Sequence, residues 1–158
     1  TNRPATTLDL QAALHAESAP EQHTLIDEWI SSVTLYDLRV ESASTELMPD
    51  GRNRVTITIR GRKSLEPGGG VKPSEAPLDE LIDVAVYAEH PLTGNAQPLY
   101  AGKHRLRTGE TQITVEVSGK PAFVSVDPFE RRIEVERADN IREITVRRPP
   151  RQPRELTS

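Results

Sequence analysis

The chain of 158 residues contains no cysteine, few aromatic residues and no long hydrophobic run. Because cysteine is absent, disulfide bonds and thiol chemistry are excluded. Aromatic residues make up 4% of the chain, so we expect no row of aromatic side chains that would stack on sugars or unpaired bases. No apolar stretch approaches the ~20 residues that a membrane-spanning helix requires. The sequence therefore predicts no membrane span within this chain.

An excess of basic charge is missing as well. The formal net charge is −4 and the isoelectric point is about 5.6, whereas proteins that bind the phosphate backbone usually have a basic surplus. We therefore expect no nucleic-acid partner. A chain of this length can bury one hydrophobic core but is too short for two, which predicts a single folded domain.

No motif for catalysis or metal binding is present. The four histidines, His15, His23, His90 and His104, include no pair four residues apart, so the zinc motif His-Glu-x-x-His is missing. The glycines at 68–70 are not followed by the Lys-Ser/Thr of a phosphate-binding loop. The sequence predicts no catalytic residue, no cofactor and no metal ligand, and therefore no enzyme activity for this chain.

Several titratable residues have simpler structural interpretations. We expect His104 to point to the inner side of a strand, beside Tyr100 and Leu106, and to be held there by a hydrogen bond. Asp127 begins an Asp-Pro-Phe turn in which its carboxylate bonds the local backbone and Phe129 returns to the core. The carboxylates of Asp79, Glu80 and Asp83 are interpreted as the start of a strand after a loop, and those of Glu134 and Glu136 as a solvated strand edge.

Residues 1–33 are predicted to be a helical lead-in segment. Ser18-Ala-Pro-Glu21 has the spacing of a capping box and favours a helix that begins there. The helical spacing of Leu25, Ile26, Trp29 and Ile30 predicts one apolar face. We interpret these four residues as a contact between domains.

From residue 34 to 147 the hydrophobic period changes to two, which is typical of strands. Three segments alternate cleanly, and five weaker ones bring the expected total to seven or eight strands. Because one open sheet would leave an apolar face in water, the pattern predicts a mainly β fold with two facing sheets, a β-sandwich preceded by one or two short α-helices. The inward positions of the clean strands are Val55, Ile57 and Ile59, Ile82, Val84 and Val86, and Ile113, Val115 and Val117.

Two segments are predicted to lie outside regular structure. Residues 63–77 contain three glycines in a row and three prolines, which is typical of a flexible loop. Residues 148–158 form a tail rich in Pro and Arg, and we expect it to be disordered.

Two short strings, Lys103-His-Arg105 and Asp127-Pro-Phe129, are the most distinctive part of a resemblance that covers residues 20–146. This region resembles the C-terminal part of bacterial membrane-associated zinc metallopeptidases of the aminopeptidase N type that are fused to permease-like helices. The stretch Arg132 to Arg137 departs from that pattern. The resemblance implies an immunoglobulin-like sandwich on the extracytoplasmic side of a membrane, with zinc bound only by the parent's peptidase domain.

Two functional hypotheses follow. In the first, the chain is a non-catalytic accessory domain that contacts the neighbouring domain of its own polypeptide or another subunit. In the second, it is an independent extracytoplasmic module whose loops bind a peptide or glycan.

Overall fold

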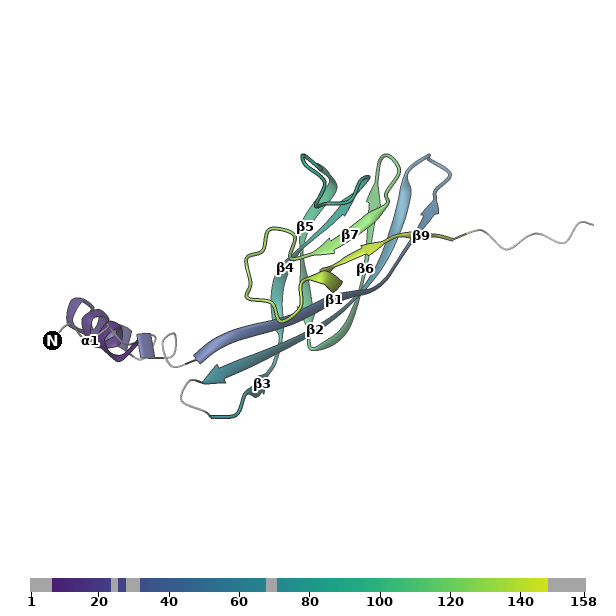
Figure 1. Ribbon diagram of the computed structural model, residues 1–158. Helices are drawn as coiled ribbons and strands as arrows, with labels where there is room; N and C mark the ends of the chain where they lie inside the picture. Colours follow the sequence, from purple (N-terminus) through teal and green to yellow (C-terminus); the bar gives the residue numbers. More distant parts are fainter. Residues whose placement is uncertain (1–6, 24–25, 28–31, 68–70, 148–158) are drawn as a thin grey trace, which may run out of the picture.

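The computed structural model describes residues 7–23, 26–27, 32–67 and 71–147. In this part of the chain a short helix, α1 (Thr7–Glu17), and a 3₁₀ turn, η1 (Pro20–Gln22), precede nine strands in two sheets (Figure 1). The five-stranded sheet contains β1 (Ser32–Leu47), β2 (Asn53–Pro67), β3 (Ser74–Ala76), β6 (Gly109–Val117) and β9 (Thr145–Val146). The four-stranded sheet contains β4 (Asp79–Tyr87), β5 (Pro98–Arg107), β7 (Phe123–Val126) and β8 (Ile141–Glu143), and a 3₁₀ turn, η2 (Ala138–Asn140), precedes β8.

A long hairpin of β1 and β2 forms the centre of the five-stranded sheet. The two strands are antiparallel from Ser32 opposite Pro67 to Leu47 opposite Asn53. The far edge of β2 is shared, because β6 pairs with its first part and β3 with its last part. On the other side, β9 runs parallel to β1 at Ser44 and Thr45.

The four-stranded sheet has the order β5-β4-β7-β8, with all pairs antiparallel. Residues 82–87 of the central strand β4 are all buried, so both of its faces are covered. A strand with apolar residues on both faces is typical of such a central position.

One hydrophobic cluster joins the two sheets. It includes Ile57 and Ile59 of β2 together with Ile82, Val84 and Val86 of β4, all essentially inaccessible to water. Since the alternating positions of both sheets point into this cluster, the sheets pack face to face in a sandwich-like arrangement. The prediction of a mainly β chain with two sheets is confirmed, with nine strands in place of seven or eight.

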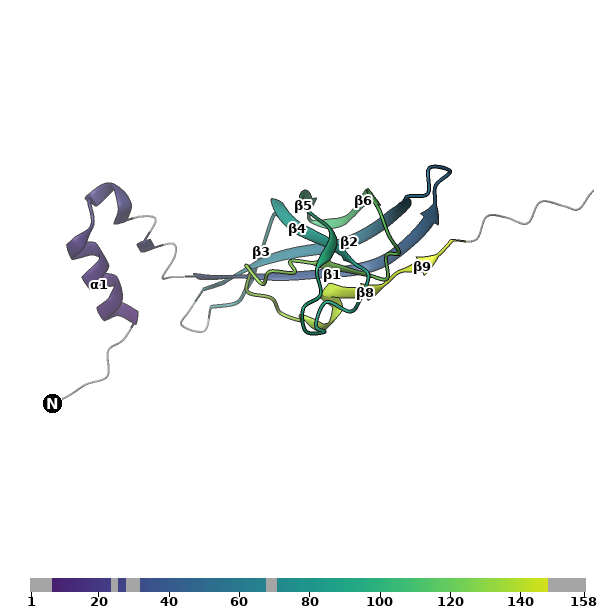
Figure 2. The ribbon, with the colours of Figure 1, turned by 90° about the horizontal axis from the view of Figure 1, so that it is seen from above.

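The β1–β2 hairpin extends beyond the end of the four-stranded sheet (Figures 1 and 2). The extension corrects the prediction of a loop over residues 63–77, which was wrong for two parts of that segment. Residues 63–67 pair with the start of β1, and β3 adds to their other edge. Leu65 keeps the alternation of side-chain directions along β2. Pairing with a strand on each side stabilises this extended segment, although the glycines and prolines that follow favour a loop. The glycines at 68–70 lie outside the described residues.

Helix α1 and the turn η1 lie beyond the start of β1, away from the sheets (Figures 1 and 2). The interactions of α1 include the stacking of His15 on His23, with ring centroids 4.2 Å apart, and a 2.6 Å hydrogen bond from Gln11 to Asp27. The predicted capping box was wrong, because Ala19 is the N-cap of η1 and no side chain caps it.

Strand β1 begins at Ser32, so the predicted helical segment ends before residue 33. Of the four predicted contact residues, Ile26 is partly buried, whereas Leu25, Trp29 and Ile30 lie outside the described residues. The tail at 148–158 lies outside them too. No helix in the described ranges has the length and apolar character needed to cross a bilayer.

Candidate functional site

Short pieces of the C-terminal segment cover the outer edge of β1 from Tyr36 onward. Tyr36 donates its N–H to the carbonyl of Ile133 (2.9 Å) and accepts from the N–H of Val135 (2.8 Å). At Leu38 the hydrogen-bond acceptor is a side chain and not a strand backbone, because the Glu134 carboxylate accepts the Leu38 N–H at 2.5 Å. Further along, Arg142 donates to the Val40 carbonyl. Covering an edge in this way prevents unwanted strand pairing. Within the part of the chain that the structure describes, this cover begins at Tyr36.

A buried turn at Asp127 directs the following residues toward β1. Asp127 has a φ of 47°, a left-handed conformation that Asp tolerates better than most residues. Its carboxylate is fully buried and accepts hydrogen bonds from the backbone N–H groups of Arg131 (3.3 Å) and Arg132 (3.1 Å). The turn was predicted with this role for Asp127. Phe129, however, is 49% exposed and does not return to the core, because the turn places it beside the Arg131 guanidinium.

A polar cluster lies at the end of the core next to this turn. Its four side chains are those of Tyr36, Lys63, Glu80 and Arg132. Glu80 accepts hydrogen bonds from Tyr36 (2.9 Å) and Lys63 (2.5 Å), and Arg132 lies 3.6 Å from it. Although burial acts to raise the pKa of Glu80, the bonds from Lys63 and Tyr36 hold this pKa below its usual value. Burial and the neighbouring Glu80 raise the pKa of Tyr36. The cluster therefore keeps Glu80 ionised and Arg132 in place.

An open groove of about 850 Å³ lies between this end of the four-stranded sheet and the projecting hairpin. Its lining contains three cationic side chains, Lys103, Arg131 and Arg132, and no aspartate, glutamate or histidine. We call it the basic groove. The remaining lining residues are Ser32, Val33, Thr34, Tyr36, Leu65 and Ile133.

Buried carboxylates behind the basic groove fix its cations. Lys103 and Arg131 both reach the same oxygen of Asp83, each at 3.2 Å, and the Asp83 side chain is only 9% exposed. Arg132 is held by Asp127 and Glu80 and by a 3.0 Å bond to the Leu81 carbonyl. Because two cations share one carboxylate at Asp83, positive charge remains directed toward the groove. Asp79, Glu80 and Asp83 lie at the start of β4 as predicted, and strand pairing brings cations from other elements over Glu80 and Asp83. The interpretation of Glu134 as a solvated edge was wrong, because Glu134 is partly buried and accepts the Leu38 N–H.

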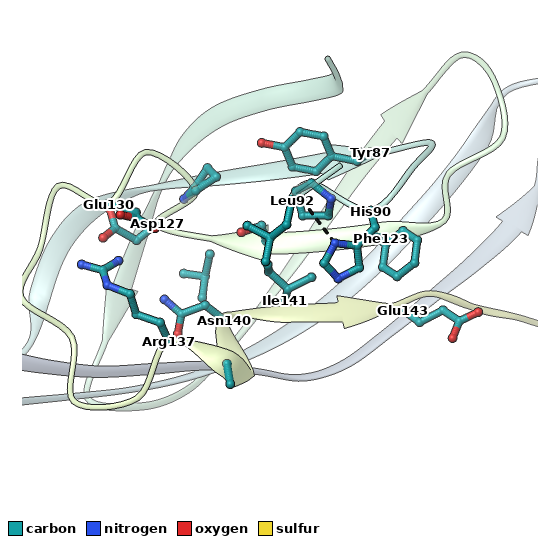
Figure 3. A pocket seen from close by; sticks show the side chains of 15 residues that line it. Tyr87, His90, Leu92, Phe123, Asp127, Glu130, Arg137, Asn140, Ile141 and Glu143 are labelled. Atoms are coloured by element: carbon teal, nitrogen blue, oxygen red, sulfur yellow. Dashed lines mark hydrogen bonds between the residues drawn. The ribbon is translucent and has the colours of Figure 1, made fainter. Parts of the chain in front are cut away.

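A second hollow, the loop pocket, measures about 430 Å³ and lies beside the outer face of β7 and β8 (Figure 3). Tyr87, Leu92 and Phe123 supply apolar surface, and the ring of His90 packs edge-on against Phe123 with centroids 4.9 Å apart. Glu130 and Arg137 stand at the opposite end from Phe123 (Figure 3). Among the described hydrogen bonds of this pocket, none joins a hydroxyl to an imidazole or carboxylate, which is the pairing an activated nucleophile requires.

The predicted role of His104 agrees with its position. It lies on the inner side of β5, and its Nε2 is 2.8 Å from the Tyr100 hydroxyl. Burial lowers its pKa, which favours the neutral ring. Gly102, between them, allows this contact, because a Cβ at that position would lie 2.3 Å from the Tyr100 hydroxyl. Among the described residues, no group of three or more His, Asp or Glu side chains is placed to hold a metal ion.

Glu134 should make stability depend on pH near neutrality. Burial raises its pKa to about 7 from 4.5, and the nearby carboxylates of Asp127 and Asp37 add to the shift. The folded chain therefore binds a proton more tightly than the unfolded chain, so stability should fall as the pH rises from about 4.5 to 7. Glu134→Gln should remove most of this loss and should be more stable than the parent chain above pH 7, as measured by urea unfolding at several pH values.

Glu136→Gln is the matched control, because Glu136 is exposed and only two residues away. This variant should keep the pH dependence of the parent chain. An unchanged pH profile in Glu134→Gln would contradict the assignment to Glu134.

Comparison with known proteins gave no match to a family model, a curated protein or a solved structure. The resemblance to the aminopeptidase-type region therefore stays a prediction. The candidate sites rest on the geometry of this chain alone. The cations of the basic groove come from β5 and from the segment after β7, and sequence reasoning did not bring these distant residues together.

Proposed function

We propose that this chain is a non-catalytic accessory module that binds a protein partner through the basic groove. The proposal rests on one observation: the groove is open, and its cations are held in place by carboxylates behind them. Arg132, whose side chain is only 15% exposed, is already ordered and loses little conformational entropy on binding, which favours recognition. The same arrangement offers no histidine or carboxylate at the groove surface that would act as a general base.

The strand order supports an immunoglobulin-like topology. In such domains the first, second and fifth strands share one sheet, and the third, sixth and seventh share the other, to which variable-type domains add a further strand. Here β1, β2 and β6 lie in one sheet, and β5-β4-β7-β8 follow one another in the second. If β3 and β9 are counted as additions, the order matches that pattern except at the fourth strand, β5, which occupies the place of the strand that variable-type domains add beside the third.

For the parent, we propose the class that the resemblance implies. The partner is then first of all the neighbouring domain of the same polypeptide, with another subunit as a further contact. Zinc would belong to that peptidase domain, and the module would lie on the extracytoplasmic side of the membrane. The resemblance of residues 20–146 is the support for these statements.

A photoreactive amino acid placed at position 103 tests the binding role in the complete parent polypeptide. We expect position 103 to cross-link to a protein segment, because Lys103 lines the basic groove. Position 105 is the control, since Arg105 lies on the same strand and is paired with Asp79 away from the groove. Mass spectrometry would identify the linked segment.

Equal cross-linking from both positions would contradict a groove-specific contact. Zinc-dependent hydrolysis of leucine p-nitroanilide by the purified chain would overturn the non-catalytic assignment. Cross-linking from Tyr87 or Phe123 in place of position 103 would favour an independent ligand-binding module that uses the loop pocket, whose apolar surface and polar groups suit a peptide side chain or a glycan.

A further inference from the structure

Along Val33–Leu35 the outer edge of β1 faces the basic groove, and no strand of the described residues pairs with it there. Both backbone polar groups of Tyr36 point to the outer edge, where they bond Ile133 and Val135. In an antiparallel pair this direction alternates from residue to residue, so the N–H and C=O of Thr34 point to the same edge. Among the described strands, none pairs with β1 at this edge between Ser32 and Leu35.

The groove and this edge coincide. Val33 and Thr34 are neighbours whose side chains point to opposite faces of β1, yet both line the groove. Because residues from both faces of β1 line the groove, the groove also includes the edge of this strand. The segment that covers β1 further along leaves it at Ile133, where Asp127 holds Arg131 and Arg132 toward the other sheet.

The chemistry of the lining indicates what that strand should contain. Lys103, Arg131 and Arg132 face the groove in a chain whose net charge is −4, so this region attracts acidic groups that the rest of the surface repels. Val33, Leu65 and Ile133 add apolar surface. A strand presents alternate side chains to alternate sides, so acidic and aliphatic residues in alternation fit both parts of the lining.

We propose that the basic groove binds an extended acidic segment of a partner protein, which adds to β1 as a strand beside Val33–Leu35. The inference rests on the proposed binding function and specifies its ligand. The backbone of Thr34 supplies main-chain hydrogen bonds, and Lys103 and Arg131 bind the carboxylates. Since both cations are already held at Asp83, the acidic segment meets a surface that needs little rearrangement.

Fluorescence anisotropy with labelled synthetic peptides tests the proposal on the full chain. The probe is a peptide of about ten residues that alternates Val with Glu, and its counterpart alternates Val with Lys. We expect the Val/Glu peptide to bind roughly tenfold more tightly than its counterpart. Raising the NaCl concentration from about 0.05 M to about 0.5 M should weaken its binding severalfold, because the contacts are partly exposed charge pairs.

Two sets of variants separate the backbone contact from the charge contact. Thr34→Pro removes an N–H that points away from β2, so the β1–β2 ladder should survive while strand addition is blocked. Thr34→Ala keeps the N–H and is its control. Lys103→Gln combined with Arg131→Gln removes the two cations, and Arg105→Gln is the matched control outside the groove. We expect Thr34→Pro and the double variant to weaken binding roughly tenfold or more, and the controls to bind like the parent chain.

Hydrogen exchange gives a readout that holds even if Thr34→Pro fails to fold. In the parent chain, the Thr34 amide should exchange more slowly when the Val/Glu peptide is added. Binding without this protection, equal binding of both peptides, or binding unaffected by the double variant would each overturn the inference. So would a dimer of the chain, seen by sedimentation, that Thr34→Pro dissociates. Cross-linking from position 103 together with failure of these peptide tests would leave the binding function in place and remove only the acidic strand.

Discussion

Replacing Asp127 with alanine should lower the free energy of unfolding by about 3 to 5 kcal/mol, because the largely buried Arg132 guanidinium loses one of its two carboxylate partners and two backbone N–H groups lose their acceptor. The Asp127 carboxylate is fully buried, and the Arg132 side chain is only 15% exposed. The same carboxylate accepts two backbone N–H groups, which would lose their acceptor. Urea unfolding followed by circular dichroism measures the effect.

Asp127→Asn is the matched control. Asparagine tolerates the left-handed conformation at this position and keeps one carbonyl oxygen for the backbone donors. We expect it to lose clearly less stability than the alanine variant. An alanine variant that unfolds within about 1 kcal/mol of the parent chain would show that the turn does not depend on this carboxylate.

Ile57→Ala should destabilise the chain by about 2 to 5 kcal/mol, because it opens a cavity in the centre of the core. The Ile57 side chain is inaccessible to water. It lies on β2, which pairs with β1 on one side and β6 on the other, so its neighbours are held from both directions and relax little. The midpoint of urea unfolding should fall accordingly.

Thr56→Ala tests whether burial, and not the strand position, explains that loss. Thr56 is the preceding residue on the same strand, but its side chain points away from the core. A cost below about 1 kcal/mol is expected. Similar losses in both variants would contradict a core centred on Ile57.

Clean alternation made the central strands predictable. Where Val55, Ile57 and Ile59 alternate with polar residues, burial of one face determines the pairing register, and these three side chains are buried as expected. One of the five weaker strand segments in the sequence spans residues 131–137. Only one bridge forms there, between Tyr36 and Glu134, because the Asp127 turn fixes Arg131 and Arg132 in another direction. The alternation of residues within one segment gives no information about such contacts with other parts of the fold.

The basic groove could not be predicted for a related reason. Its cations are separated in the sequence, and each becomes part of a site only when strand pairing places a carboxylate behind it. The one usable signal was Asp83, a charged residue within the apolar run of a central strand. A charge at such a position is buried only when it is paired, so it predicts a cationic neighbour without naming it.

The parallel pairing of β9 with β1 has a mechanical consequence. The chain enters the two sheets at the start of β1 and leaves them after β9, near opposite ends of the molecule (Figure 1). Tension applied between those ends would act along β1 and β9. The backbone hydrogen bonds that join Ser44 and Thr45 to β9 would then be loaded together, in shear. Shear of this kind resists force better than unzipping, because the bonds of the pair must break together.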